Sequence, residues 1–490
     1  PDYFLTNTGK NEQNLGFQLD KKLSGVWNMR VHASTFNTTI GVLRGAHIGN
    51  LTDLEDAIHR DRPFFTSDHF SYDLASPSQE VHHHLIKLEN RWQVDKNTLW
   101  SLNIGSQVDD RKEYDVRRSG RSATPALHLR QYTQFIEGIY HHTYARDLDL
   151  KSGLQFQFIN NTNFPETGVL PLIPDYQSVK PSLYTIVQKA WGKNMLEGGL
   201  RIDYQQLLAV TISKTVPRVV DRFTHHFLNA SGALGYRQAI STGLNLSANA
   251  GVVYRSPEVN ELYSNGLHQG VSGLEEGNPD LQSEKSIKGI LSAEWNVSDR
   301  LQIQALIYDH HIRDFIYLQP LKEFRLTIRG AFPVYEYRQT DARLTGSDLL
   351  ISYELKKRLK WIGKYAYVVG RDVVQRRGLV NIPSSNMQHS FNYSFKDATN
   401  FKQTNLTLTF RYMGRQRNIT EDQDYLPPPD AYTMFGVELG SNIQLGNHQV
   451  KCSVQIENLL DTTYRDYLNR QRYFADEPGR NINFRIGYFF

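Results

Sequence analysis

Cysteine, long apolar runs and a strong net charge are what this sequence lacks. Cys452 is the single cysteine of the 490 residues, so no disulfide bond can form within the chain. No run approaches the ~20 apolar residues that a membrane-spanning helix needs, which excludes a helical membrane protein. The net charge is +4 and the basic residues are dispersed, so the composition gives no support for nucleic-acid binding. No secretory signal is recognisable, and an exported protein would have lost it or carry it outside this sequence.

Aromatic residues and alternating patterns are abundant. Aromatics make up 12% of the chain, with 27 Tyr against 6 Trp, although hydrophobic residues reach only 39% and the mean hydropathy is −0.51. Apolar and polar residues alternate with the period of a β-strand in residues 244–254, 405–412, 433–440 and 450–457. The polar faces carry amides and charges, which suits a wet lumen, and β-sandwich strands are commonly shorter, around 5–6 residues. The pattern predicts an all-β fold, an antiparallel transmembrane β-barrel.

Short turns and long loops alternate between the predicted strands. The short polar turns are residues 21–25, 95–98, 192–194, 241–243, 298–300, 356–360, 396–400 and 445–449. The long loops are residues 44–81, 109–124, 160–177, 256–283, 372–384, 414–430 and 459–479. This layout is typical of an outer-membrane barrel, with short turns on the periplasmic rim and long loops outside. We expect about 19 strands in one domain over residues 1–490, without a helix or an interdomain linker.

The chain closes on an amphipathic strand, NINFRIGYFF. One face would carry Phe484, Ile486, Tyr488 and Phe490, which we interpret as a membrane-assembly signal. Because both ends of a bacterial barrel lie on the periplasmic side, this last strand should run towards the periplasm. Counting back, the first recognisable strand (about 12–21) runs the same way, so residues 1–11 would lie in an external loop. We therefore expect that an odd number of barrel strands precedes the sequence.

Two motifs resemble a known family, the TonB-dependent outer-membrane receptors. Residues 254–286 contain an Arg-x-Pro start, a Glu-Leu pair and a Gly-Asn-Pro-x-Leu-x-x-Glu end, all typical of that family. The matching residues are Arg255, Pro257, Glu261, Leu262, Gly277, Asn278, Pro279, Leu281 and Glu284. Residues 456–467 resemble the family's Asn-Leu-x-Asp-x-x-Tyr signature, residues 478–490 its closing strand, and residues 42–54 another of its segments.

The resemblance implies that parts of the receptor are missing from this sequence. Receptors of this family have 22 strands filled by an N-terminal plug that contacts TonB, and no segment here resembles the plug or a TonB box. The plug and the first strands would lie in a segment outside this sequence or in a separate chain. The implied activity is TonB-energised uptake of a scarce solute, with a ferric siderophore or similar metal chelate as first choice. Haem, cobalamin, oligosaccharide and peptide remain open, and no cofactor is expected.

Amphipathic aromatics and arginines in the long loops are candidates for ligand capture, since they offer flat apolar area together with hydrogen-bond donors. The candidates are Arg44, His47, Tyr254, Arg255, Tyr263, His268, Arg470, Arg472 and Tyr473. Each of them has a purely structural alternative, as a residue that packs its loop or lies at the rim. Tyr254, Tyr412 and Tyr488 at strand ends also fit an interfacial aromatic girdle in contact with outer-membrane lipid.

Histidines and acids suggest metal sites only weakly. Adjacent residues of a strand point to opposite faces, so the paired histidines cannot chelate one ion. His82 and His84 share a face and could bind a transition metal weakly, but no third ligand stands at a fixed spacing. The acidic stretch 109–115 could offer oxygen ligands to Ca²⁺, although a solvated loop with internal ion pairs is favoured.

Two other classes of barrel remain as alternatives. A barrel enzyme would need a nucleophile and base at its rim; Asp309 and His310 are neighbours, yet no nucleophile motif such as G-x-S-x-G occurs, and catalysis is not expected. An unplugged porin or adhesin is formally permitted, although porins have fewer strands, about 16–18.

Overall fold

A single curved wall of antiparallel strands dominates the computed structural model, which describes residues 3–116, 120–144, 147–446 and 448–489. Nineteen wall strands follow one another, which confirms the predicted number. They are β2 (Lys10–Lys22), β3 (Trp27–Gly41), β5 (Ser78–Gln93), β6 (Thr98–Tyr114), β7 (Leu127–Tyr144), β8 (Leu148–Asn163), β9 (Asp175–Trp191), β10 (Asn194–Ile212), β11 (Val220–Ala239), β12 (Leu244–Arg255), β15 (Glu284–Ser298), β16 (Leu301–Thr327), β17 (Gly330–Lys356), β18 (Leu359–Asp372), β20 (Asn386–Ser394), β21 (Phe401–Met413), β22 (Tyr432–Leu445), β23 (His448–Glu457) and β24 (Asn481–Phe489).

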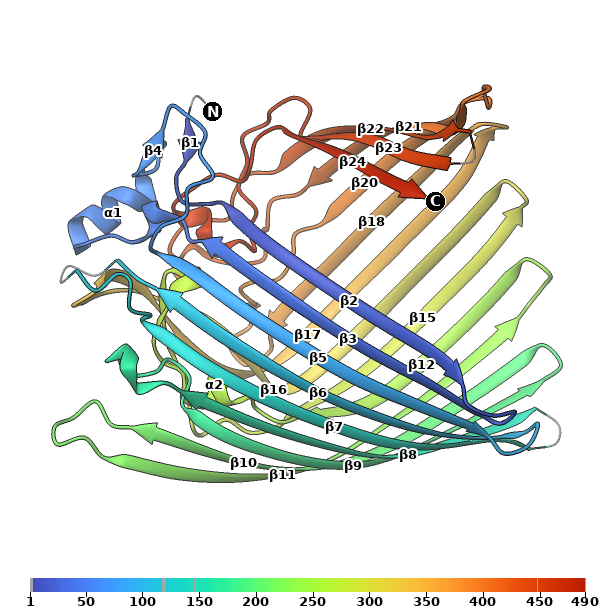
Figure 1. The fold of residues 1–490 in the computed structure, drawn as a ribbon, viewed down its shortest axis with the longest axis horizontal. Coiled ribbons are helices and arrows are strands. Elements are labelled where there is room, and N and C mark those ends of the chain that lie inside the picture. Colours follow the sequence, from blue (N-terminus) through green and yellow to red (C-terminus); the bar gives the residue numbers. More distant parts are fainter. Residues whose placement is uncertain (1–2, 117–119, 145–146, 447, 490) are drawn as a thin grey trace.

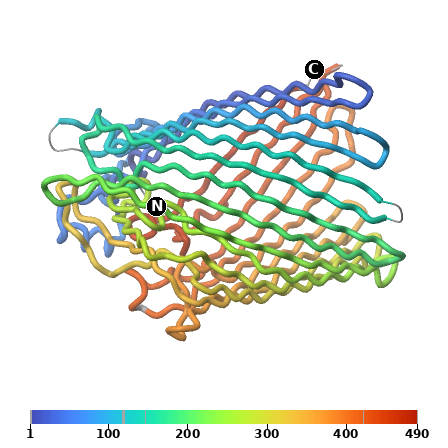
Figure 2. Tube along the Cα trace, turned by 90° about the horizontal axis from the view of Figure 1, so that it is seen from below, coloured from blue at the N-terminus to red at the C-terminus, as the bar shows by residue number. Residues whose placement is uncertain are grey.

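Each wall strand pairs antiparallel with the next one along the chain, as β2 does with β3 and β23 with β24. Figure 1 shows the tilted strands wrapping round a lumen, and Figure 2 shows the same wall from below. Within the described residues, β2 pairs only with β3, and β24 only with β23. In the part of the chain that the structure describes, the wall thus begins at β2 and ends at β24, and no pairing joins these two strands (Figure 1).

The two faces of the wall differ as the alternation predicts. Apolar residues of neighbouring strands lie opposite each other in the sheet. Phe484 of β24 pairs with Val454 of β23, which in turn pairs with Leu439 of β22. These side chains point away from the lumen and are widely exposed, reaching 75% for Phe484 and 79% for Ile486. Tyr488 shares this face, whereas Phe490 lies outside the described residues. Exposed apolar area of this extent is stable only against lipid.

Short elements occupy the long loops. They include two α-helices, α1 (Leu51–His59) and α2 (Val259–Tyr263), and five short strands: β1 (Phe4–Leu5), β4 (Thr66–Ser67), β13 (Asn265–His268), β14 (Gly273–Glu276) and β19 (Arg377–Gly378). A single β-bridge joins Ile48 to Ala331. The expectation of no helix was wrong, because nine and five residues are too few to reveal a helical period in a loop. Neither helix has the length and apolar character to cross a membrane.

The predicted loop at 109–124 was also wrong in its first part. Strand β6 continues to Tyr114, so the acidic stretch lies within the sheet except for its last residue, Asp115. Cross-strand pairs explain how so many charges fit a strand: Asp109 pairs with His83 at 3.1 Å, and Asp110 with Arg130 at 2.6 Å. Cross-strand pairs of this kind stabilise a sheet. The polar residues of this stretch are therefore compatible with a continuing strand β6.

Candidate functional site at the mouth of the wall

Four segments far apart in sequence meet at the long-loop end, and we call residues 42–77, 256–283, 316–337 and 459–480 the mouth. A buried apolar cluster joins α1 to the tip of the β16–β17 hairpin and to the last loop. Its buried members include Leu54, Ile58, Ala331, Tyr335 and Phe474. Asn50 caps α1 by accepting a hydrogen bond from the Asp53 amide at 2.8 Å, which fixes where the helix begins. The mouth is thus a packed structure.

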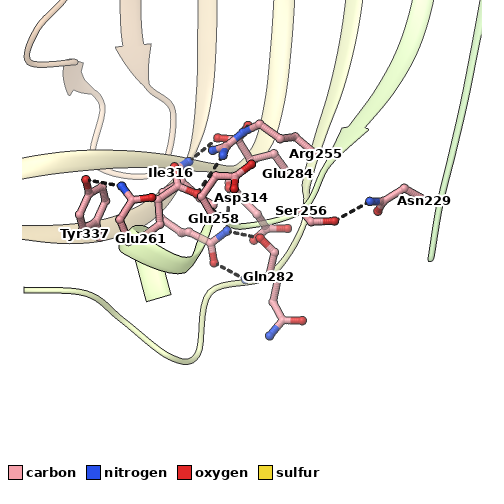
Figure 3. Close-up of polar contacts among 12 residues, drawn as sticks. Asn229, Arg255, Ser256, Glu258, Glu261, Gln282, Glu284, Asp314, Ile316 and Tyr337 are labelled. Atoms are coloured by element: carbon pink, nitrogen blue, oxygen red, sulfur yellow. Dashed lines mark hydrogen bonds and ion pairs between the residues drawn. The ribbon is translucent and has the colours of Figure 1, made fainter. Parts of the chain in front are cut away.

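Arg255 ties the middle of the mouth to the wall. Its Nε lies 2.7 Å from Oε2 of Glu284, and its Nη1 lies 2.8 Å from Oε2 of Glu261 (Figure 3). The same Glu261 oxygen accepts the Glu258 amide at 2.8 Å, which completes the capping box of α2. Oε1 of Glu284 accepts the Ile316 amide at 2.7 Å, so one arginine links β12, α2, β15 and β16.

Glu275 joins the middle and last loops. Its Oε1 lies 2.9 Å from Nη1 of Arg470 and 3.1 Å from Nδ1 of His268, and the carboxylate is almost fully buried. The Arg470 guanidinium also stacks over the Tyr335 ring, 4.9 Å from its centroid. Burial alone would raise the pKa of Glu275, but the hydrogen bond and charge of His268 and the charge of Arg470 hold it below its ordinary value.

Asp115 joins the first and middle loops. The carboxylate is buried, with His47 Nδ1 at 3.5 Å, Arg329 Nη1 at 3.8 Å, and Gln269 Nε2 donating to it at 3.1 Å. Burial opposes its charge, yet the contacts with His47 and Arg329 lower the pKa of Asp115 overall. Arg44, three residues before His47, stacks on the Phe65 ring at 4.8 Å, and burial lowers the pKa of its guanidinium.

Asp424 anchors the last loop from inside. Arg472 Nη2 lies 2.5 Å from its Oδ2, and the Tyr473 hydroxyl donates to its Oδ1. All three side chains are nearly inaccessible to solvent. Burial, together with the negative charge of Asp424 and the neighbouring Tyr335, raises the pKa of the Tyr473 hydroxyl well above its ordinary value.

Tyr263 lines a pocket at the mouth. The pocket has a volume of about 430 Å³ and lies between α2, the loop before β9 and the turn after β10. Phe223 stacks on Tyr263 with ring centroids 5.4 Å apart, and Lys214 and Glu276 add opposite charges to the lining. Nε2 of His225 lies 2.6 Å from the Tyr263 hydroxyl, and burial raises the pKa of Tyr263 to about 12.

The structure thus brings most of the predicted site residues into contact with the mouth's framework. Tyr254 is the exception, because it lies on the outward face of β12, with the Lys285 ammonium 5.7 Å from its ring centroid. The sequence did not single out Glu275 and Asp424, and it noted Asp115 only as the end of the acidic stretch 109–115. These carboxylates belong to no recognisable spacing, and their partners lie up to 195 residues away.

The histidines considered as metal ligands are not part of a metal-binding group in the described residues. His82 lies 2.8 Å from the side-chain oxygen of Asn37, and no group of three histidine, cysteine or acidic residues suited to a metal ion occurs in the described part of the chain. The pairing of His82 and His84 as a metal site therefore gains nothing from the structure.

Comparisons with known proteins agree with the fold of the wall. The family described as TonB dependent receptor-like, beta-barrel, matches residues 27–459. The copper transporter OprC superposes with a TM-score of 0.78 at 16% identity, covering 99% of this chain and 73% of that one. The ferric-catecholate import receptor Fiu from E. coli K12 gives 0.70 at 13% identity, covering 99% and 76%.

The ferric yersiniabactin uptake receptor FyuA from Yersinia pestis has a TM-score of 0.64 at 14% identity, covering 100% of this chain and 73% of that one. The family and these neighbours are receptors and transporters, not enzymes. Lipid therefore surrounds the outward face, and in barrels of this kind the end with the long loops is the extracellular one. The chain belongs to the TonB-dependent receptors of the bacterial outer membrane, and residues 27–459 match their β-barrel domain.

Proposed function

We propose that the chain forms the wall and mouth of a receptor that imports a scarce solute with energy from TonB. The first-choice substrate is a ferric siderophore or a similar metal chelate. The family supports TonB-coupled uptake of a small molecule. Fiu and FyuA are named for ferric chelates and OprC for copper, which favours a metal-bearing substrate here.

The pocket beside Tyr263 is the observation that carries the proposal. Its volume of about 430 Å³ falls in the range of small-molecule sites, roughly 300–1,000 Å³. It combines aromatic surface from Tyr263 and Phe223 with the ammonium of Lys214. The two carboxylates of the lining, Glu276 and Glu336, are each paired with an arginine, Arg325 and Arg338. The flat apolar surface with a cation beside it suits a flat aromatic chelate. Among the nine residues expected from the sequence, Tyr263 is the one we assign to ligand contact at this pocket.

The remaining mouth residues would keep the pocket in shape. Five of these side chains direct their donor groups to buried carboxylates and so have none left for a ligand at those atoms. They are Arg255, His268, Arg470, Arg472 and Tyr473. His47 contacts Asp115 at 3.5 Å without a hydrogen bond. Side chains held in this way cost less entropy when a ligand binds, because they are ordered beforehand.

A plug domain and further barrel strands would complete the receptor. The unpaired edges of β2 and β24, as far as the described residues go, offer hydrogen-bonding groups to additional strands. We propose that a segment outside residues 1–490, or a separate chain, supplies both these strands and the plug. TonB would act through that plug.

Uptake in cells tests the proposal. A strain lacking the gene and a complemented strain would be grown under iron limitation and supplied with labelled ferric chelates. We expect the complemented strain alone to take up label, and only when TonB is functional. Unchanged growth and uptake would reject a ferric chelate, and TonB-dependent uptake of an oligosaccharide or peptide would identify the other substrate classes. Passage of small solutes without TonB would favour an unplugged porin.

A further inference from the structure

The outward face of the wall carries a polar cluster where lipid is expected. Asp309 on β16 lies 2.8 Å from Nε of Arg343 and 2.9 Å from Nε2 of His311, and it accepts a hydrogen bond from Thr345 at 2.9 Å. Register places these residues on the lipid side, because Asp309 follows Ile307 on the same face and Ile307 pairs with Leu291. Charged groups on a lipid face are costly, so their presence calls for a partner.

The cluster lies at the outer edge of the apolar band. Arg343 is separated from the periplasmic end of β17 at Lys356 by about 40 Å of strand, at ~3.3 Å per residue. A tilt of about 45° converts this length to about 30 Å along the membrane normal, and the apolar band is about 25 Å tall. The guanidinium of Arg343 therefore reaches the level of the lipid headgroups in the outer leaflet.

A groove runs from this cluster across the outward face. Its volume is about 1,030 Å³, and small side chains at Ala248, Ala250, Gly289 and Ser347 leave room between the larger Leu291 and Ile307. A Cβ built on Gly289 would meet nothing within 4 Å, which shows how open the floor is. The apolar part of the groove fits an acyl chain, and its end opens at Arg343 and Arg371.

The charges at that end are incompletely compensated. Arg343 and Arg371 are direct cross-strand partners, and like charges in this position destabilise a sheet. Asp309 pairs with Arg343, whereas no partner is seen for the exposed Arg371 within the described residues. Two more cations, Lys285 and Arg313, pair with each other across the strands of the outward face. One further acid, the exposed Asp341, is set against them in the count of charges. The balance is positive, so an anion between the two arginines would relieve their repulsion.

We propose that this groove binds a phosphorylated lipid of the outer leaflet. One acyl chain would lie along Leu291 and Ile307, and a headgroup phosphate would accept hydrogen bonds from Arg343 and Arg371. Guanidinium groups match phosphate oxygens with two parallel hydrogen bonds, which gives direction as well as charge. A second copy of this chain fits less well, because a two-fold contact pairs the patch with itself, so two surfaces of net positive charge would meet.

Native mass spectrometry of the complete receptor in detergent tests the proposal. The probe is a phosphorylated bacterial glycolipid, compared with the same glycolipid after its phosphates have been removed. The wild-type protein should bind the phosphorylated form about ten times more tightly. The double variant Arg343→Gln/Arg371→Gln should lose this preference, and Gly289→Leu, which fills the groove, should weaken binding of both forms.

The matched control is Arg338→Gln, since Arg338 is an exposed arginine of the same strand whose partner is Glu336 at 2.6 Å. It should bind both lipids like the wild type. Equal affinity of the wild-type protein for the two glycolipids would overturn the proposal, as would a phosphate preference that survives in the double variant. A wild-type dimer that Gly289→Leu converts to a monomer would also overturn it in favour of a second copy. Should the double variant not fold, Gly289→Leu decides alone.

Discussion

Arg470 and Glu275 are 195 residues apart in sequence, and their Nη1 and Oε1 atoms lie 2.9 Å apart. The pair joins the last loop to the middle loop across the mouth, and His268 contacts the same oxygen. Asp115 does the equivalent for the first and middle loops through His47 and Gln269. Two buried carboxylates therefore hold the three loops that the family motifs delimit.

Glu275→Gln should loosen the mouth. The neutral amide leaves Arg470 without its counter-charge and weakens the contact with His268, and a hydrogen bond to a charged group contributes about 1.5–3 kcal/mol. Amide hydrogen exchange should therefore accelerate about 10- to 100-fold in residues 264–277 and 466–475. Glu323→Gln is the matched control, because Glu323 is exposed and pairs with Arg325 at 2.9 Å. Equal exchange in both variants would show that the Glu275 contacts do not hold the loops.

Acid should open the mouth before it affects the wall. The pKa values of Glu275 and Asp115 are both lowered in the folded protein. Their stabilisation is therefore complete above the unfolded values, near pH 4, and is lost as the pH falls through the folded values. Limited proteolysis at pH 7, 5 and 3 should show loop cleavage only at the lowest pH. Cleavage that is independent of pH would contradict this linkage.

Arg255→Met should release α2 from the wall. Glu261 and Glu284 are largely buried, with side chains 13% and 11% exposed, and would lose their shared cation. Because Arg255 itself is partly exposed, we expect a local cost of about 2 kcal/mol, read as faster exchange in residues 259–263. Arg237→Met, which breaks an exposed pair with Glu294, should cost less than about 1 kcal/mol. Similar effects of the two substitutions would remove the special role of Arg255.

Gly277→Ala should displace the pocket. A Cβ at this position would lie 2.5 Å from the backbone nitrogen of Tyr263 and 2.6 Å from the carbonyl carbon of Leu262. Neither backbone atom can yield without moving α2, so binding at the pocket should fall while the wall stays folded. Gly138→Ala is the control, since a Cβ there meets nothing within 4 Å. Wild-type uptake in a Gly277→Ala strain would place the ligand elsewhere.

The wall could be predicted from the sequence because its rule is local. Alternation and turn residues each reveal themselves within ten or fifteen positions, as they do in residues 405–412. The acidic stretch 109–115 misled this reading, since its charges are compensated by His83 and Arg130 on neighbouring strands. The mouth obeys no local rule. Arg470 was identified as a candidate, but its partner Glu275 depends on loop packing that no spacing encodes.

The most direct test of the account is to read the two faces of β24 in a membrane. With Cys452 replaced by Ser, single cysteines at positions 484 to 487 would carry a fluorophore in vesicles containing brominated lipid. Labels at 484 and 486 should be quenched by the brominated chains, and labels at 485 and 487 by iodide in water. Quenching of all four labels by the same agent would show that this wall does not separate lipid from water.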